Sequence, residues 1–264
     1  MKVLIVLAHP ERRSYTAALA DTARDTLRKA GHTAEISDLY SMKFSPVLGL
    51  ADFPFRSADD ATLNIAHEQT MAFDAGLLAQ DIATEQRKLQ MADILILQFP
   101  MWWFGMPAIM KGWVDRVLTC GFAYQSGRKY DTGMFYKKRG LVAVTTGTAA
   151  DTYAPNGIDG DIMSVLWPIH NGILHYTGFD VLSPFVAYEP ARRTPAERAS
   201  LLDSYAERIK RLEEEQPLFF HPASDYGPDE RLKPGVQART VAQRNSWALE
   251  TNLERKNHYR SIPN

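Results

Sequence analysis

Short runs of apolar residues alternate along the chain with longer segments in which apolar positions recur at helical spacing. Continuous runs rich in Val, Ile and Leu are typical of strands that are buried on both faces of a parallel sheet. Strands are therefore predicted at 3–8, 33–38, 94–99, 141–145 and 181–187. Helices are predicted at 15–30, at 81–91, from Pro107, at 162–176 and at 195–215.

This alternation predicts an α/β fold, a doubly wound parallel sheet of five strands with helices on both faces. In the flavodoxin-like strand order, 2-1-3-4-5, strands one, three and four lie side by side. Ligands of such sheets bind at the carboxyl ends of the strands, near the point where the winding reverses. The loops after strands one, three and four should therefore converge on one site.

Two stretches fall outside this pattern. Residues 40–80 form a connection that is too long for a simple crossover. Residues 217–264 form a tail with little periodicity, yet Phe219, Phe220, Tyr226 and Trp247 make it too apolar for a disordered segment. We predict a catalytic domain at 1–216 and a C-terminal extension at 217–264 that wraps the core or a partner subunit.

Composition and charge narrow the class of protein. The 264 residues include 30 Lys and Arg against 31 Asp and Glu, a balance that favours neither nucleic acid nor an anionic membrane as partner. No stretch approaches the roughly 20 apolar residues of a transmembrane helix, and the N-terminus lacks a signal-peptide pattern. The single cysteine, Cys120, fits a reducing compartment. We predict a cytoplasmic protein without a transmembrane segment or a metal site.

The first of the three loops, residues 9–16, has neither the glycine pattern of a classical dinucleotide fold nor that of a P-loop. It offers His, Arg and hydroxyl side chains immediately before a predicted helix. The exposed N–H groups and the dipole of a helix N-terminus favour a phosphate. The alternative is that Ser14 serves only as the helix cap.

The second loop, residues 99–107, carries Trp102, Trp103 and Phe104 at the carboxyl end of a buried strand. Turns favour Gly, Asn, Asp, Ser and Pro rather than large aromatic residues. A flat ligand such as an isoalloxazine would explain these side chains, because aromatic faces stack well. A core or interface cluster is the alternative.

The third loop is Thr145-Thr146-Gly147-Thr148. Its hydroxyls and amides could bind the polar edge of a flavin, and Gly147 would allow close approach of the backbone. A plain threonine-rich turn is the alternative. The occurrence of all three loops after neighbouring strands is a stronger signal than any one of them.

At these loops the sequence resembles the NAD(P)H:quinone oxidoreductases of the DT-diaphorase type, flavodoxin-like enzymes that bind FAD and work as homodimers. The similar segments are found along nearly the whole chain, at 7–9 with Ser14, 37–40, 98–100, 103–105, 107–109, 111–113, 122–124, 145–147, 157–158 with 160–161, 166–169, 194–196 and 261–263.

The resemblance implies roles for particular residues. FAD would be held by His9, Ser14, Tyr15, Thr16, Asn64, Pro100, Met101, Trp102, Trp103, Phe104, Thr145, Thr146, Gly147, Thr148, Tyr153 and Arg198. The acceptor pocket would be lined by Trp103, Phe104, Tyr124, Ser126 and Tyr176, some of them contributed across the dimer interface. The residues that would act in catalysis are Tyr153, Asp159 and Gly147.

The chain departs from the family pattern at three of these positions. Asp159 stands where the best-known members have a histidine that works with the tyrosine on charge at the reduced flavin. An aspartate cannot supply a positive charge, and it donates a proton only if burial raises its pKa. Ser126 replaces a second pocket tyrosine and Thr148 replaces a glycine, and both changes alter the shape of the pocket.

The resemblance implies ping-pong hydride transfer from NADH or NADPH to the flavin and then to a quinone or a similar flat acceptor. One alternative is an FMN-dependent azo- or nitro-reductase on the same fold, although the long C-terminal portion argues for FAD. Another is a regulatory flavoprotein subunit of a potassium efflux transporter. The sequence selects neither nicotinamide and does not identify the physiological acceptor.

Overall fold

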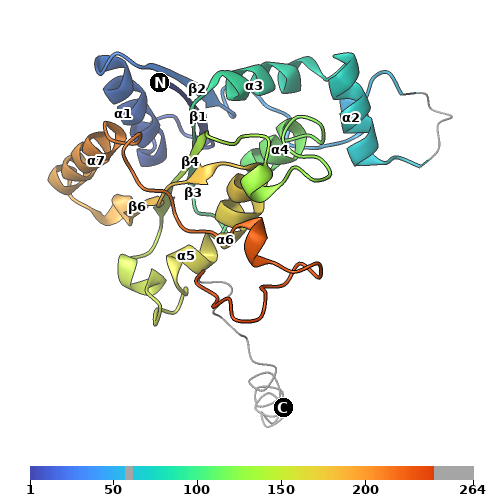
Figure 1. The fold of residues 1–264 in the computed structure, drawn as a ribbon. Coiled ribbons are helices and arrows are strands. Elements are labelled where there is room, and N and C mark those ends of the chain that lie inside the picture. Colours follow the sequence, from blue (N-terminus) through green and yellow to red (C-terminus); the bar gives the residue numbers. More distant parts are fainter. Residues whose placement is uncertain (57–61, 241–264) are drawn as a thin grey trace, which may run out of the picture. The chain divides into compact units, whose positions relative to one another are not determined.

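The computed structural model describes residues 1–56 and 62–240. A parallel sheet lies at the centre of the fold, with the order β2-β1-β3-β4-β5 and with β6 also paired to β4 (Figure 1). The predicted flavodoxin-like order is therefore confirmed. The strands are β1 (Lys2–Leu7), β2 (Thr33–Asp38), β3 (Ile94–Pro100), β4 (Arg139–Thr146), β5 (Asp180–Val181) and β6 (Phe185–Tyr188).

The central strand β3 shows why continuous apolar runs predict this sheet. It lies between β1 and β4, and all seven of its residues are buried. Its one polar side chain, Gln98, donates to the carbonyl of Ala143 and accepts a hydrogen bond from the hydroxyl of Tyr205. A polar group inside the sheet is thereby satisfied without water.

Helices cover both faces of the sheet. On one face, α1 (Tyr15–Lys29) and α7 (Pro195–Ile209) enclose a core that includes Ile5, Ile96 and Leu141 (Figure 1). Against the other face lie α3 (Gln80–Met91) and α4 (Ala108–Val117). The remaining α-helices of the described residues are α2 (Ile65–Ala75), α5 (Ile162–Val165) and α6 (Trp167–Ile169).

Three predicted elements differ in extent from the structure. The strand expected at 181–187 is divided into β5 and β6, with Pro184, which has no N–H to donate, between them. The helix expected at 162–176 is divided into α5, α6 and a π-helical turn, His170–His175, after Pro168. The helix expected at 195–215 ends at Ile209.

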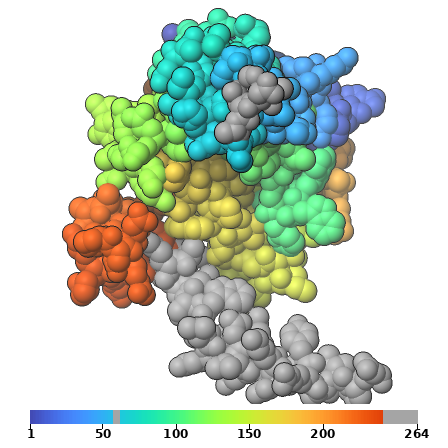
Figure 2. Space-filling view, turned by 90° about the vertical axis from the view of Figure 1, so that its right-hand side faces the viewer, coloured from blue at the N-terminus to red at the C-terminus, as the bar shows by residue number. Residues whose placement is uncertain are grey.

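The long connection between β2 and β3 contains α2, which was not predicted, and lies at the surface, in blue and cyan in Figure 2. A buried guanidinium holds it to α4. Arg116 donates to Asp52 at 2.6 Å and to Asp81 at 2.5 Å. Gly112 of α4 also touches the connection, since a Cβ atom there would lie 2.2 Å from the carbonyl oxygen of Pro46.

The chain divides into two compact units, Met1–Leu218 and Phe219–Asn264. In the described part of the second unit, His221 is buried, with Nδ1 2.7 Å from a carboxylate oxygen of Asp225 and Nε2 accepting from the amide of Arg239. The wrapping role of the extension stays a prediction, and Trp247 lies outside the described residues. Within 1–56 and 62–240, no helix has both the length and the apolar character needed to cross a bilayer.

Candidate functional site

Three loops meet at the carboxyl edge of the sheet, as the strand order predicts. The hydroxyl of Thr16, after β1, lies 2.8 Å from that of Thr145, at the end of β4, and both groups are buried. The amide of Met101, after β3, donates to the carbonyl of Thr145 at 2.8 Å. The rings of His9 and Trp102 are 6.3 Å apart. Loops from three strands are thus fixed to one another by direct contacts.

The first loop ends in a helix N-terminus with free donors. Ser14 caps α1 by accepting from the amide of Ala17, and its predicted contact with FAD stays a prediction. The N–H groups of Tyr15 and Thr16 have no acceptor within the described residues. They are available to an anion in addition to the cap.

Charged side chains of the first loop are engaged with one another. Arg13 pairs with Glu11 and lowers the pKa of that carboxyl to about 2. Arg12 pairs with Asp21 and Asp38. His9 is held through Nδ1, which lies 3.0 Å from the Glu11 amide. The donors left for a ligand are therefore backbone N–H groups and the imidazole rather than the two arginines.

The second loop is a tight hairpin turn that carries two aromatic side chains. Trp102 and Gly105 exchange backbone hydrogen bonds of 3.1 and 3.0 Å, and the residues between them, Trp103 and Phe104, have φ of 51° and 58°. A turn with positive φ at both central positions normally contains Asn and Gly. Trp103 is 97% exposed and Phe104 52% exposed. Strained backbone and exposed aromatic surface together point to a binding role.

The third loop presents open backbone. A Cβ atom on Gly147 would meet no described atom within 4 Å, so residues 1–56 and 62–240 leave space beside this glycine. The N–H groups of Gly147 and Thr148 have no acceptor in the described part of the chain. The hydroxyl of Thr146 donates to the carbonyl of Thr148 at 2.8 Å and fixes the turn.

A tyrosine and an aspartate border the third loop. Tyr153 is buried, and its ring lies 6.4 Å from that of Phe104 on the second loop. Asp159 accepts a 3.1 Å hydrogen bond from the hydroxyl of Thr148. Gly157 makes this arrangement possible, because a Cβ there would lie 2.3 Å from the carbonyl oxygen of Thr152. The carboxylate therefore faces the loop as a hydrogen-bond acceptor.

Tyr188 is a residue of this region that the sequence interpretation missed. It ends β6, and its ring lies 6.1 Å from that of Tyr153. Burial raises its pKa, with smaller contributions from Tyr153 and Asp161, so the phenol is neutral at neutral pH. Tyr188 could have been found from its place at the end of the predicted fifth strand, because the carboxyl ends of all parallel strands lie at the same edge of the sheet.

Two of the predicted cofactor residues lie on other elements. Asn64 is exposed and caps α2 by accepting from the amide of His67, and its predicted contact with FAD stays a prediction. The backbone carbonyl of Arg198, on α7, accepts a hydrogen bond from the hydroxyl of Tyr15. The guanidinium of Arg198 donates to the carbonyl of Arg193. Arg198 is thus connected to the first loop through its backbone.

The predicted acceptor residues form a separate aromatic cluster. The rings of Tyr124 and Tyr176 are 5.8 Å apart, and Tyr130, which was not predicted, lies 5.3 Å from Tyr176. Ser126 is exposed in the hairpin between Tyr124 and Tyr130. Burial raises the pKa of Tyr124 and of Tyr176. Within the described residues no ring contact or hydrogen bond joins this cluster to the three loops of the same chain.

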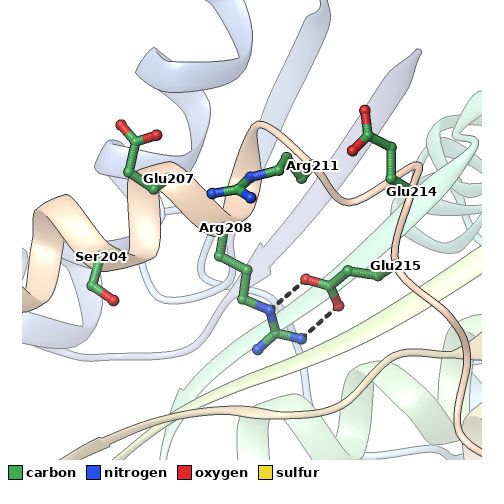
Figure 3. A pocket seen from close by; sticks show the side chains of 6 residues that line it. All are labelled: Ser204, Glu207, Arg208, Arg211, Glu214 and Glu215. Atoms are coloured by element: carbon green, nitrogen blue, oxygen red, sulfur yellow. Dashed lines mark hydrogen bonds and ion pairs between the residues drawn. The ribbon is translucent and has the colours of Figure 1, made fainter.

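A hollow at the end of α7 has a structural explanation (Figure 3). It is lined by Ser204, Glu207, Arg208, Arg211, Glu214 and Glu215. The guanidinium of Arg208 makes two hydrogen bonds to Glu215, of 2.7 and 2.9 Å, and also donates to the carbonyls of Ser183 and Pro184. These bonds fasten α7 to the segment between β5 and β6, so the side chains of this hollow have a structural role.

Comparison with known proteins shows the family of the chain. A family model described as the flavodoxin-like fold matches residues 1–212. The chain belongs to this family. Its flavodoxin-like relatives include NAD(P)H dehydrogenase (quinone) 1 of Rattus norvegicus, 41% identical over 84% of this chain and 81% of the relative. Ribosyldihydronicotinamide dehydrogenase (quinone) of Pongo abelii is 40% identical over 82% of this chain and 94% of the relative.

A solved flavodoxin-like structure is similar over almost the entire chain. It comes from Klebsiella pneumoniae, and its name gives quinone reduction as a provisional function. It has a TM-score of 0.86 at 38% identity and covers 92% of this chain and 98% of its own. The resemblance to the quinone oxidoreductases that the loops indicated is confirmed by these relatives.

Proposed function

We propose that the chain is an FAD-dependent NAD(P)H dehydrogenase that reduces quinones by two electrons in a ping-pong reaction. The observation that carries this proposal is the meeting of three loops at the carboxyl edge of the sheet, where free N–H groups and exposed aromatic faces lie together. The names of the rat and orangutan relatives support the activity.

The residues present fit a flavin dinucleotide. The free N–H groups of Tyr15 and Thr16, at the start of a 15-residue helix, suit a phosphate. The exposed rings of Trp102 and Phe104 suit a flat, polarisable ring system. The empty space beside Gly147 leaves room for the polar edge of that ring.

When bound, FAD supplies the two-electron chemistry between nicotinamide and quinone. The chain binds and orients the reactants. With the cofactor bound, the phenol of Tyr153 and the N–H groups of Gly147 and Thr148 would be the hydrogen-bond donors available to stabilise negative charge on it. Asp159, which already accepts a hydrogen bond from the Thr148 hydroxyl, adds no positive charge there. Charge stabilisation therefore depends on the tyrosine and the backbone.

A homodimer with sites at the interface belongs to the same proposal. The connection between β2 and β3 exposes large apolar side chains, including Val47, Leu50, Met71 and Leu77, which a subunit interface would cover. A second copy would also bring Tyr124 and Tyr176 to loops that they do not contact within one chain. Sedimentation of the holoprotein tests this point. A cytoplasmic location accords with the free cysteine, Cys120.

An anaerobic titration of the purified holoprotein tests the function. NADH and NADPH are added in turn while flavin absorbance is followed, and a quinone is then added. Bleaching in a single two-electron step, then recovery with quinone, is the expected result. A bound flavin that neither nucleotide reduces would overturn the proposal. The mass of the released cofactor distinguishes FAD from FMN.

A further inference from the structure

We propose that Lys129 makes the acceptor site selective for flat electron acceptors that carry an anionic group, such as a carboxylated quinone. This inference rests on the proposed function, because it assigns the substrate class of the same site. Lys129 was not among the residues predicted from the sequence.

The ammonium of Lys129 lies against the aromatic cluster. Its Nζ atom is 5.8 Å from the centre of the Tyr176 ring, the ring that also meets Tyr124 and Tyr130. A small hairpin places it there, since Gln125 bridges to Arg128 and Gly127 between them has φ of 74°. A cation over the face of a tyrosine ring is held by the negative charge of that face. The charge of Lys129 is thereby held at the wall of the predicted acceptor pocket.

Nothing in the described part of the chain neutralises this ammonium by an ion pair. Lys88, Lys111 and Lys210, by contrast, each lie within 3 Å of a carboxylate oxygen. Because the ammonium of Lys129 is half-buried and has no ion pair among the described residues, an anionic ligand would stabilise it.

Neighbouring titratable groups leave the local charge positive. Burial lowers the pKa of His175 to about 4, against a smaller opposing effect of Asp131, so the imidazole is neutral at neutral pH. The phenols of Tyr124 and Tyr176 are neutral as well, because burial raises their pKa. Arg128 and Lys129 against Asp131 then give two positive charges and one negative, a net charge of +1 on this segment.

The substituents of an acceptor that lies flat on the tyrosine rings would extend past the edge of those rings. The ammonium of Lys129 could there pair with an anionic substituent. A neutral acceptor stacks on the same rings but gains no ion pair. A partly exposed ion pair contributes up to about 1 kcal/mol, which corresponds to a preference of about fivefold in kcat/KM.

The test compares two acceptors that differ only in charge: 2-methyl-1,4-naphthoquinone with a propionate side chain at carbon 3, and the corresponding primary amide. Steady-state kcat/KM is measured with the holoprotein at saturating NADH or NADPH. The variants are Lys129→Met, which keeps the length of the side chain, and Lys129→Arg, which keeps the charge. Lys137→Met is the matched control, because Lys137 also lies over a tyrosine ring, at 5.5 Å from Tyr136, but outside the cluster.

The acid-to-amide ratio of kcat/KM should fall about fivefold in Lys129→Met, through a higher KM for the acid, and should be restored in Lys129→Arg. The ratio in Lys137→Met should equal that of the wild type, and so should its rate with the amide. Equal ratios in Lys129→Met and the wild type would overturn the inference alone. Failure of the wild type to reduce either compound would overturn the proposed function and the inference together.

Discussion

Replacing Trp103 with glycine should make the apoprotein more stable while weakening its hold on the flavin. Trp103 has φ of 51°, where a side chain costs about 1–2 kcal/mol relative to right-handed backbone. Glycine avoids that cost but loses about 0.5–1 kcal/mol more conformational entropy on folding. Because the indole is 97% exposed, its removal sacrifices almost no buried surface. The net gain is about 0.5–1 kcal/mol, or about 1–4 °C in Tm.

The assay is thermal unfolding of the apoprotein, because bound flavin would add its own stabilisation in proportion to affinity. Lys137→Gly is the matched control, since Lys137 is exposed, has φ of 69° and lies outside the three loops. Both variants should gain Tm without cofactor. Only Trp103→Gly should lose flavin affinity, by about twofold to tenfold, the value of one aromatic contact.

A lower apoprotein Tm for Trp103→Gly beside a higher Tm for Lys137→Gly would refute this reasoning, since it would mean that the indole is packed in solution. Unchanged flavin affinity in Trp103→Gly would show that the exposed ring of Trp103 does not contribute to flavin binding.

Three further outcomes are expected. Tyr153→Phe should slow flavin reduction by NAD(P)H about tenfold or more in rapid-reaction experiments, and an unchanged rate would remove the tyrosine from charge stabilisation. Burial lowers the pKa of His170 from 6.5 to about 4, so the unfolded chain binds more protons between these values and stability falls as the pH is lowered through them. At pH 5 the loss is about 2 kcal/mol, and urea unfolding of His170→Gln should show a smaller difference between pH 7 and pH 5 than the wild type. Arg116→Met removes the guanidinium that pairs with both Asp52 and Asp81 and should cost about 3–5 kcal/mol in urea unfolding, whereas the exposed Lys111→Met should cost less than about 1 kcal/mol.

The meeting of the three loops could be predicted from the sequence because the strands are continuous apolar runs. Once β1, β3 and β4 are neighbours, the loops after them must meet, and the contact of Thr16 with Thr145 shows that they do. Helix α2 was missed because its apolar side chains do not define one buried face: Met71 and Phe73 are exposed, while Ala72 is buried.

Side-chain contacts between loops could not be predicted from the pattern of apolar and polar residues. The bond from Thr148 to Asp159 depends on a turn that closes only because Gly157 lets two backbone segments touch. Lys129 was overlooked for a related reason. A lysine in a polar hairpin is normally a solvated surface charge, and only the fold shows that its ammonium lies over Tyr176.

The hydrogen bond between Thr16 and Thr145 joins residues that are 129 positions apart in the chain. A contact so remote in sequence forms only after three strands have assembled, and topologies rich in such contacts fold slowly. During synthesis, the chain must therefore emerge beyond β4 before the first loop acquires its final neighbours. A site built from these three loops is therefore complete only after β4 has joined the sheet.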